Sequence, residues 1–138
     1  MRHGWAVLAG LALTTTAFAQ DVVGTFTGVY KVDMSKLKVD DRKMMQAIID
    51  ASKITMSIRK DKTFVVTITN INQNSRTEGT YRVVNGTLVT TDRRRNGKAV
   101  PDSSRRMTTF TISNGGRTLT AKLKKGPGPA QLILTKKS

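Results

Sequence analysis

The amino-acid sequence predicts a mainly β domain, in which about eight antiparallel strands form a meander that closes into an up-and-down barrel. Short runs rich in Thr, Val and Ile recur along the chain and are separated by turn residues, a pattern typical of strands that pair in sequence order. A single segment, after the first strand, changes to helical periodicity. An even number of such strands can close on itself, and closure leaves no unpaired sheet edge.

The first strand and the helix come directly after one another in the chain. The strand is expected at residues 22–32, where branched and aromatic residues alternate with turn-tolerant ones. Gly28 within it indicates a bulge or a bend. The helix is expected at residues 40–52, with Asp40 or Asp41 placed to cap its N-terminus. Its broad apolar face comprises Met44, Met45, Ala47, Ile48, Ile49 and Ala51.

The remaining strands follow the helix without another change of period. Asn85-Gly86 is the strongest hairpin motif, because both central positions of a type I′ turn need positive φ. Residues 92–103 are expected to form a longer polar connection, and Gly126-Pro127-Gly128-Pro129 a stiff loop before the last strand. The seven strands are expected at residues 53–59, 63–71, 76–84, 87–91, 105–113, 117–123 and 131–136.

The N-terminus has the composition of an export signal. Arg2 precedes an apolar run from Trp5 to Leu13, and Ala17-Phe18-Ala19 is typical of a cleavage site. The apolar run is shorter than the roughly 20 residues that span a bilayer. We therefore expect residues 1–19 to be removed, residues 20–138 to fold as one domain, and the protein to be periplasmic or secreted. Because the chain has no cysteine, its core alone must hold the fold.

The sequence argues against an enzyme of the common classes. His3 is the sole histidine, so residues 20–138 have neither imidazole nor thiolate for a nucleophilic triad or for a zinc or copper site. The carboxylates lie mostly in predicted turns, which does not favour a paired-carboxylate hydrolase. Glu78 lies within a strand and is expected to pair with a cross-strand Lys or Arg. We expect no metal and no cofactor.

Three short motifs carry a family resemblance. They are Gly28-Val29-Tyr30, then Gly79-Thr80-Tyr81 with Asn85-Gly86-Thr87-Leu88, and finally Gly116-Arg117-Thr118-Leu119-Thr120. Together with the order of one strand, one helix and seven strands, they resemble the small lipocalin-like domains of exported bacterial proteins, members of the calycin group. Tyr30 stands where true lipocalins have a tryptophan. The resemblance implies a barrel or half-barrel and assigns no function to individual residues.

The charge of the chain points to anionic partners. The formal net charge of +15 attracts polyanions, and arginine's planar fork suits phosphate and carboxylate groups. Residues 92–106 concentrate cations with only Asp92 and Asp102 against them, and the alternative is a solvated, mobile loop. No aromatic residue lies between Asp92 and Met107, which argues against sequence-specific recognition of nucleic acid. The predicted anion-binding residues are Arg93, Arg94, Arg95, Lys98, Arg105 and Arg106.

A second candidate site is apolar. Met45, Ile49 and Met56 are flexible or branched fillers that could line a ligand pocket, and ordinary core packing is the alternative. The helix would cover one end of a hollow barrel as a lid, or plug a filled one. We expect a lipocalin-like, non-enzymatic protein that holds a small apolar, amphipathic or anionic ligand, or an anionic envelope component, at the barrel mouth. The alternative is a structural or inhibitory protein-docking module without a pocket; the oligomeric state is left open.

Overall fold

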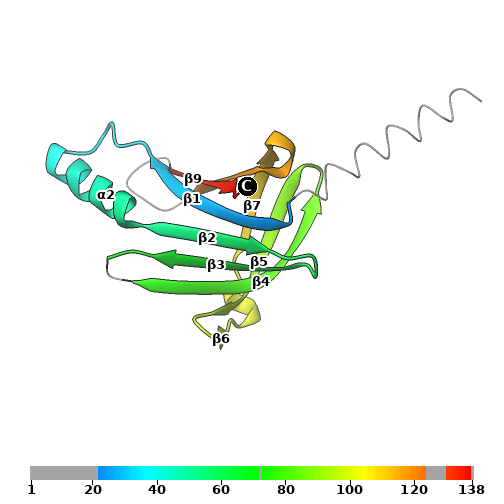
Figure 1. The fold of residues 1–138 in the computed structure, drawn as a ribbon. Helices are drawn as coiled ribbons and strands as arrows, with labels where there is room; N and C mark the ends of the chain where they lie inside the picture. Colours follow the sequence, from blue (N-terminus) through cyan, green and yellow to red (C-terminus); the bar gives the residue numbers. More distant parts are fainter. Residues whose placement is uncertain (1–21, 72, 124–129, 138) are drawn as a thin grey trace, which may run out of the picture.

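The computed structural model describes residues 22–71, 73–123 and 130–137. In this part of the chain one α-helix follows the first strand, and all other regular elements are strands or short 3₁₀ turns (Figure 1). The predicted signal peptide and the Gly-Pro loop at residues 126–129 lie outside the described residues. The elements are β1 (Gly24–Val32), α2 (Val39–Ala51), β2 (Lys53–Ile58), β3 (Thr63–Thr69), β4 (Asn74–Val84), β5 (Thr87–Arg95), β6 (Lys98–Ala99), η1 (Asp102–Ser104), β7 (Met107–Ser113), η2 (Asn114–Gly116), β8 (Thr118–Leu123) and β9 (Ala130–Lys136).

The strands close into a ring. Each strand pairs antiparallel with the next in the order β1, β2, β3, β4, β5, β7, β8, β9, and β9 pairs back to β1. The short β6 pairs only with the end of β5. This confirms the predicted eight-stranded up-and-down barrel with one helix between its first two strands.

The barrel interior is packed with apolar side chains. Successive residues of a strand point to opposite faces, and the inward positions are those that the barrel removes from water. Phe26, Met56, Leu88 and Leu119 are each 0% exposed, and they belong to one contiguous cluster contributed by strands all around the ring. The described strands therefore surround a filled core rather than a wide cavity.

Two glycines are required by close packing. Pairing runs through Gly28 on both sides without a register shift, so the predicted bulge there is wrong; instead, a Cβ at Gly28 would lie 2.6 Å from the Leu134 Cδ2 atom. The register shift occurs at Gly79, where a Cβ would lie 1.9 Å from the carbonyl oxygen of Thr91. Because Glu78 pairs with Arg94 and Gly79 with Asp92, Arg93 is the extra residue of a β-bulge.

The predicted polar connection at residues 92–103 is partly wrong. β5 continues to Arg95, turns at Asn96 and Gly97, and returns as β6. Asn96 and Gly97 have φ of 52° and 80°, the same left-handed pair that Asn85 (49°) and Gly86 (75°) adopt at the predicted hairpin. The charged residues continue the strand because they lie at its solvent-exposed end.

The helix α2 lies outside the core. Its N-cap residue is Lys38, which makes no side-chain capping hydrogen bond, so the predicted capping by Asp40 or Asp41 is wrong. Both aspartates lie instead in the first turn, where their negative charge interacts favourably with the helix dipole. None of its residues is buried. Figure 1 shows α2 extending beyond the ends of β1 and β2, so the helix inserts no plug into the barrel.

Candidate functional site

The two described hollows of the surface lie at one end of the barrel. In the antiparallel ring, β1, β3, β5 and β8 finish at this end, where α2 also connects β1 to β2. We call it the helix-bearing end. The chain termini of the described domain lie at the opposite end, where β1 starts and β9 finishes.

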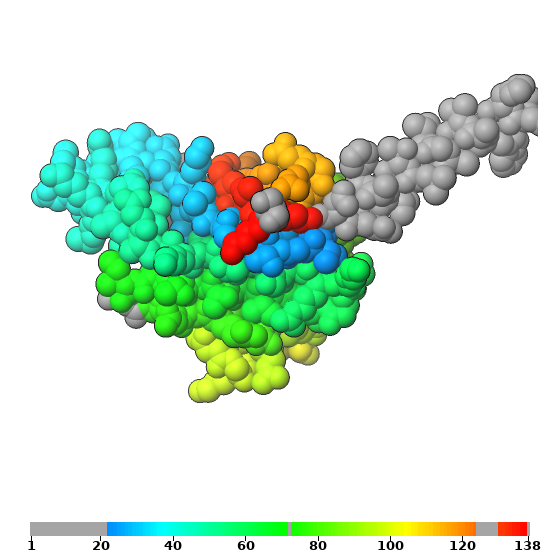
Figure 2. All heavy atoms as spheres, in the orientation of Figure 1, coloured from blue at the N-terminus to red at the C-terminus, as the bar shows by residue number. Residues whose placement is uncertain are grey.

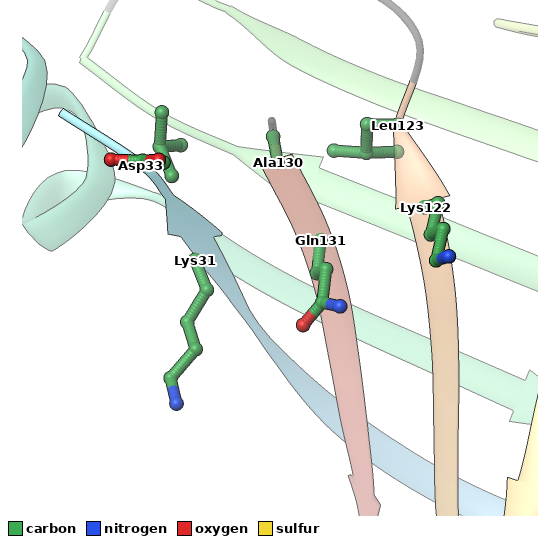
Figure 3. Close-up of a pocket in the computed structure, with 7 residues that line it drawn as sticks. Lys31, Asp33, Lys122, Leu123, Ala130 and Gln131 are labelled. Atoms are coloured by element: carbon green, nitrogen blue, oxygen red, sulfur yellow. The ribbon is translucent and has the colours of Figure 1, made fainter. Parts of the chain in front are cut away.

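The larger hollow, which we call the rim hollow, has a volume of 620 Å³ (Figure 3). It is formed by the last residues of β1 and β8 and the first residues of β9. Its volume falls within the usual range of about 300 to 1,000 Å³ for small-molecule sites. Its lining residues are Lys31, Val32, Asp33, Lys122, Leu123, Ala130 and Gln131.

Strand register explains the mixed chemistry of the rim hollow. Gln131 pairs with Lys31 on one side and with Lys122 on the other, so three polar side chains form one row on the outer face of the barrel. The next row contains Val32, Ala130 and Leu123, which face the interior. Since the hollow wraps around the strand ends, it combines an apolar floor with a polar wall.

The polar wall carries net positive charge. Lys31 and Lys122 are exposed and lie two strands apart, a separation of about 10 Å between Cα atoms. The Asp33 carboxylate accepts a hydrogen bond of 3.0 Å from the backbone N–H of Ser35. Hydrogen bonding to Ser35 lowers the pKa of Asp33, so this carboxylate stays ionised at neutral pH. With two ammonium groups and one carboxylate, the polar wall therefore has a net charge of about +1 at neutral pH.

The smaller hollow lies between α2 and the turn that joins β3 to β4. It has a volume of 280 Å³ and is lined by Ile48, Asn70, Ile71 and Gln73. The Asn70 side-chain oxygen accepts a hydrogen bond of 2.8 Å from the Gln73 N–H, which shapes the turn. Ile71 is 74% exposed and Ile48 45%, so two isoleucines give this otherwise polar hollow an exposed apolar part.

The three predicted pocket residues are not assembled into one cavity. Met56 lies in β2, pairs with Phe26 and Val66, and is fully buried in the core. Met45 and Ile49 are half-buried residues of α2. Met56 thus packs as the core residue that the sequence allowed as its alternative, and a ligand role for Met45 and Ile49 stays a prediction.

The predicted anion-binding residues do come together. Arg95 pairs with Lys98 across the β5–β6 turn, and the Asp92 N–H donates a hydrogen bond of 2.9 Å to the Arg106 carbonyl. Figure 1 shows β6 well separated from α2. The sequence therefore predicted two groups of residues that the fold places on different parts of the surface. Their role in binding stays a prediction.

Glu78 lies beside this basic region. Its carboxylate forms an ion pair of 2.8 Å with Arg76 on the same strand, and Arg94 is its direct cross-strand neighbour. The hydrogen bond from Arg76 is the main cause that lowers the pKa of Glu78, with further attraction from Arg94 and Arg59. The ion pair thus forms along the strand with Arg76 and not with the predicted cross-strand partner, because residues two apart on a strand share one face.

Sequence reasoning missed the rim hollow. Lys31 is distant in the chain from Lys122 and Gln131, and each of the three looks like an ordinary outward strand residue. The β8–β9 pairing makes Lys122 and Gln131 neighbours, and only the β1–β9 pairing that closes the barrel adds Lys31 to them. The sequence contained one indication of this site, because all three residues lie at or next to an end of a predicted strand.

The described residues offer neither a metal-binding cluster nor a membrane-spanning helix. Nowhere in them do three His, Cys, Asp or Glu side chains gather in a way that could hold a metal ion. Within the same residues no helix has the length and apolar character needed to cross a membrane.

Comparisons with known proteins were made on sequence and on structure. No protein-family profile and no curated protein sequence matches the chain. Among solved structures, the chain is similar to the REP1-NXSQ fatty acid transporter, with 10% identity and a TM-score of 0.45 over 87% of this chain and 98% of that one. It is also similar to apo lipid binding protein 8 of Caenorhabditis elegans, with 10% identity and a TM-score of 0.44 over 86% and 96% of the two chains. Of the barrel or half-barrel that the resemblance to lipocalin-like domains implied, the chain forms the closed barrel.

Proposed function

We propose that this protein is an exported, non-enzymatic binding protein that holds a small amphipathic anion in the rim hollow. The observation that carries the proposal is the juxtaposition, in one hollow of 620 Å³, of two lysines with an apolar floor. An apolar segment of the ligand would contact Val32, Leu123 and Ala130. Its carboxylate, sulfate or phosphate group would lie against Lys31 and Lys122, where charge-assisted hydrogen bonds are strongest.

The filled core limits where such a ligand can bind. Phe26, Met56 and Leu134 are at most 1% exposed, so a guest inside the barrel would have to displace packed side chains. The rim hollow requires no such displacement because it lies at the strand ends and not within the packed core. We therefore propose a site at the end of the barrel, for a ligand that keeps its charged group in water.

The proposals of export and of a non-enzymatic role rest on different residues. Export is supported by the signal-like composition of residues 1–19. Val22, three residues after the expected cleavage site, is 2% exposed and belongs to the core, so removal of residues 1–19 would leave the described fold intact. A non-enzymatic role is supported by the lack of His and Cys after His3. Mass measurement of the protein recovered from the periplasm or medium tests export, and a chain starting at Met1 there would contradict it.

Ligand binding is tested with dodecyl phosphate as an amphipathic anion. We expect wild-type protein to bind it in titration calorimetry, and the Lys31→Gln/Lys122→Gln variant to bind at least about tenfold more weakly, as loss of a charge-assisted contact predicts. The matched control is Lys43→Gln/Lys60→Gln, which removes two exposed lysines outside the hollow and should change the affinity by less than about twofold. Equal affinity of all three proteins, or no binding by wild type, would contradict the proposal.

The filled core also favours a second candidate function, a protein-docking module without a ligand pocket. Such a module would purify without any bound small molecule. Native mass spectrometry of protein purified gently from its own compartment distinguishes the two functions. A stoichiometric bound mass that is lost in Lys31→Gln/Lys122→Gln supports the carrier, whereas a bare chain that binds no dodecyl phosphate supports the docking module.

A further inference from the structure

The cationic segment of residues 92–106, which we call the basic hairpin, comprises the end of β5, the two-residue strand β6 and the η1 turn. Asn96 and Arg76 exchange two hydrogen bonds, from the Asn96 N–H to the Arg76 carbonyl at 2.7 Å and from the Arg76 N–H to the Asn96 side-chain oxygen at 2.9 Å. The Val100 N–H donates to the Arg93 carbonyl at 2.8 Å, and Val100 is 7% exposed. These hydrogen bonds hold the hairpin backbone against β4 and the barrel, and they thereby fix the backbone positions of its cationic residues.

Most of these cations are available to a partner. Arg95 contacts the Asp92 carboxylate at 3.4 Å, and Arg105 contacts that of Asp102 at 2.8 Å. Elsewhere in the hairpin, no carboxylate of the described residues lies within ion-pair distance of the exposed side chains of Arg93, Arg94, Lys98 and Arg106. Arg94 uses one guanidinium N–H on the Gly97 carbonyl at 2.9 Å, which orients the group and leaves other donors free.

The β-bulge aligns the arginines along one ribbon. Arg93 is the inserted residue, and Gly79 allows β4 to approach at this point because it has no side chain. The bulge shifts the residues that follow by one position relative to β4, so that Arg94 faces Glu78. Arg76 already pairs with that carboxylate, so Glu78 does not cancel the positive field of the hairpin arginines.

Shape and composition indicate the class of partner. Figure 2 shows the segment that contains the basic hairpin projecting as a knob below the barrel, and a two-stranded ribbon of this kind fits a groove about 12 Å wide. The hairpin has no aromatic residue on which the bases of a single strand could stack. It exposes no large apolar side chain for insertion into a bilayer. What remains is a set of guanidinium donors suited to phosphates.

We propose that the basic hairpin docks onto the phosphate backbone of double-stranded nucleic acid without reading its sequence. The contacts are charge-assisted hydrogen bonds from Arg93, Arg94, Arg106 and Lys98. Each contacted phosphate releases a counterion, so the affinity falls steeply with salt. This site shares no residue with the rim hollow, so its success or failure leaves the proposed ligand-binding function untouched.

The test compares salt dependence in wild type and in a variant with four cations removed. Binding of a fluorescent 20-base-pair duplex is measured by anisotropy across a range of NaCl concentrations. We expect two unrelated duplex sequences to bind wild type within about twofold of each other. The Arg93→Gln/Arg94→Gln/Lys98→Gln/Arg106→Gln variant should reduce the slope of log affinity against log salt by about 0.9 for each lost phosphate contact, and by about 3 to 4 in total.

A control variant that loses the same number of positive charges elsewhere on the surface distinguishes the hairpin's contribution from that of net charge. Lys36→Gln/Lys38→Gln/Lys43→Gln/Lys53→Gln neutralises four exposed lysines near α2 and should alter the slope by less than about 1. The variant Arg93→Lys/Arg94→Lys/Arg106→Lys keeps the charge and should retain most of the slope. An equal loss in both Gln variants would overturn the proposal, as would tighter binding of wild type to the matching single strand or to anionic vesicles than to duplex. Circular dichroism of each variant establishes that the barrel is retained.

Discussion

At the scale of single residues, Tyr81 shows how one polar atom is accommodated in the barrel wall. Tyr81 is 6% exposed, and its hydroxyl donates a hydrogen bond of 2.5 Å to the carbonyl oxygen of Arg59. The ammonium of Lys62 lies 5.6 Å from the ring centre, within the range of a cation–π contact. The tyrosine therefore ties β4 to the turn between β2 and β3.

Tyr81 also makes stability depend on pH in the alkaline range. Burial, with a smaller contribution from Asp61, raises the pKa of Tyr81 above its usual value of 10.0. The folded state thus favours the protonated phenol, so its stabilising effect is present below pH 10 and is lost as the pH rises through the folded-state pKa. We expect Tyr81→Phe to lower the free energy of unfolding by about 1 kcal/mol at pH 7, and the difference from wild type to shrink above pH 10. Urea denaturation at both pH values measures this, and a constant difference would contradict it.

At the scale of elements, the two Asn-Gly turns offer a matched pair. Asn85 and Asn96 both have positive φ, but only Asn96 also accepts a hydrogen bond through its side chain, from the Arg76 N–H. Asn85→Gly should therefore be nearly neutral, because glycine adopts this backbone conformation readily. Asn96→Gly should lower the free energy of unfolding by about 1 kcal/mol through the lost hydrogen bond. Equal effects in urea denaturation would show that the side chain of Asn96 does not fix the hairpin.

The helix and the barrel should respond differently to truncation of similar side chains. Met45→Ala and Ile49→Ala remove atoms from α2, which has no buried residue, and each should lower the free energy of unfolding by less than about 1 kcal/mol. Met56→Ala empties space in the core, where the residue is 0% exposed, and should lower it by about 2 to 5 kcal/mol. A large effect in α2 would show that the helix packs on the barrel in solution.

At the scale of the whole molecule, net charge opposes compactness. A formal charge of +15 on 138 residues creates self-repulsion in the folded state, and salt screens it with a Debye length of about 10 Å at 0.1 M. We expect Tm to rise by a few degrees between 20 and 300 mM NaCl, since about 1 kcal/mol shifts Tm by roughly 4 °C in a domain of this size. The variant with four neutralised hairpin cations should show a smaller rise in calorimetry. An identical rise would assign the repulsion to other parts of the surface.

Barrel closure also explains which functional residues were predictable. The six cations of the basic hairpin are close in sequence, so their clustering could be predicted before the fold was known. The rim hollow depends on Lys31, Gln131 and Lys122, which lie on three strands and meet only through the β1–β9 and β8–β9 registers. Met45 and Met56 are the same residue type, but Met45 is half-buried on the helix α2, whereas Met56 is fully buried in the core.

Local patterns in the chain were sufficient to determine the number and order of the eight barrel strands, the place of the helix and the turn at Asn85-Gly86, because alternation and turn chemistry are properties of neighbouring residues. They were not sufficient to show that Gly79 accommodates a bulge, that β5 extends to Arg95, or that no residue of α2 is fully buried. Those features depend on contacts between residues distant in the chain, such as Gly79 with Thr91. The tertiary structure decided them because only packing determines which strand approaches which, and in what register.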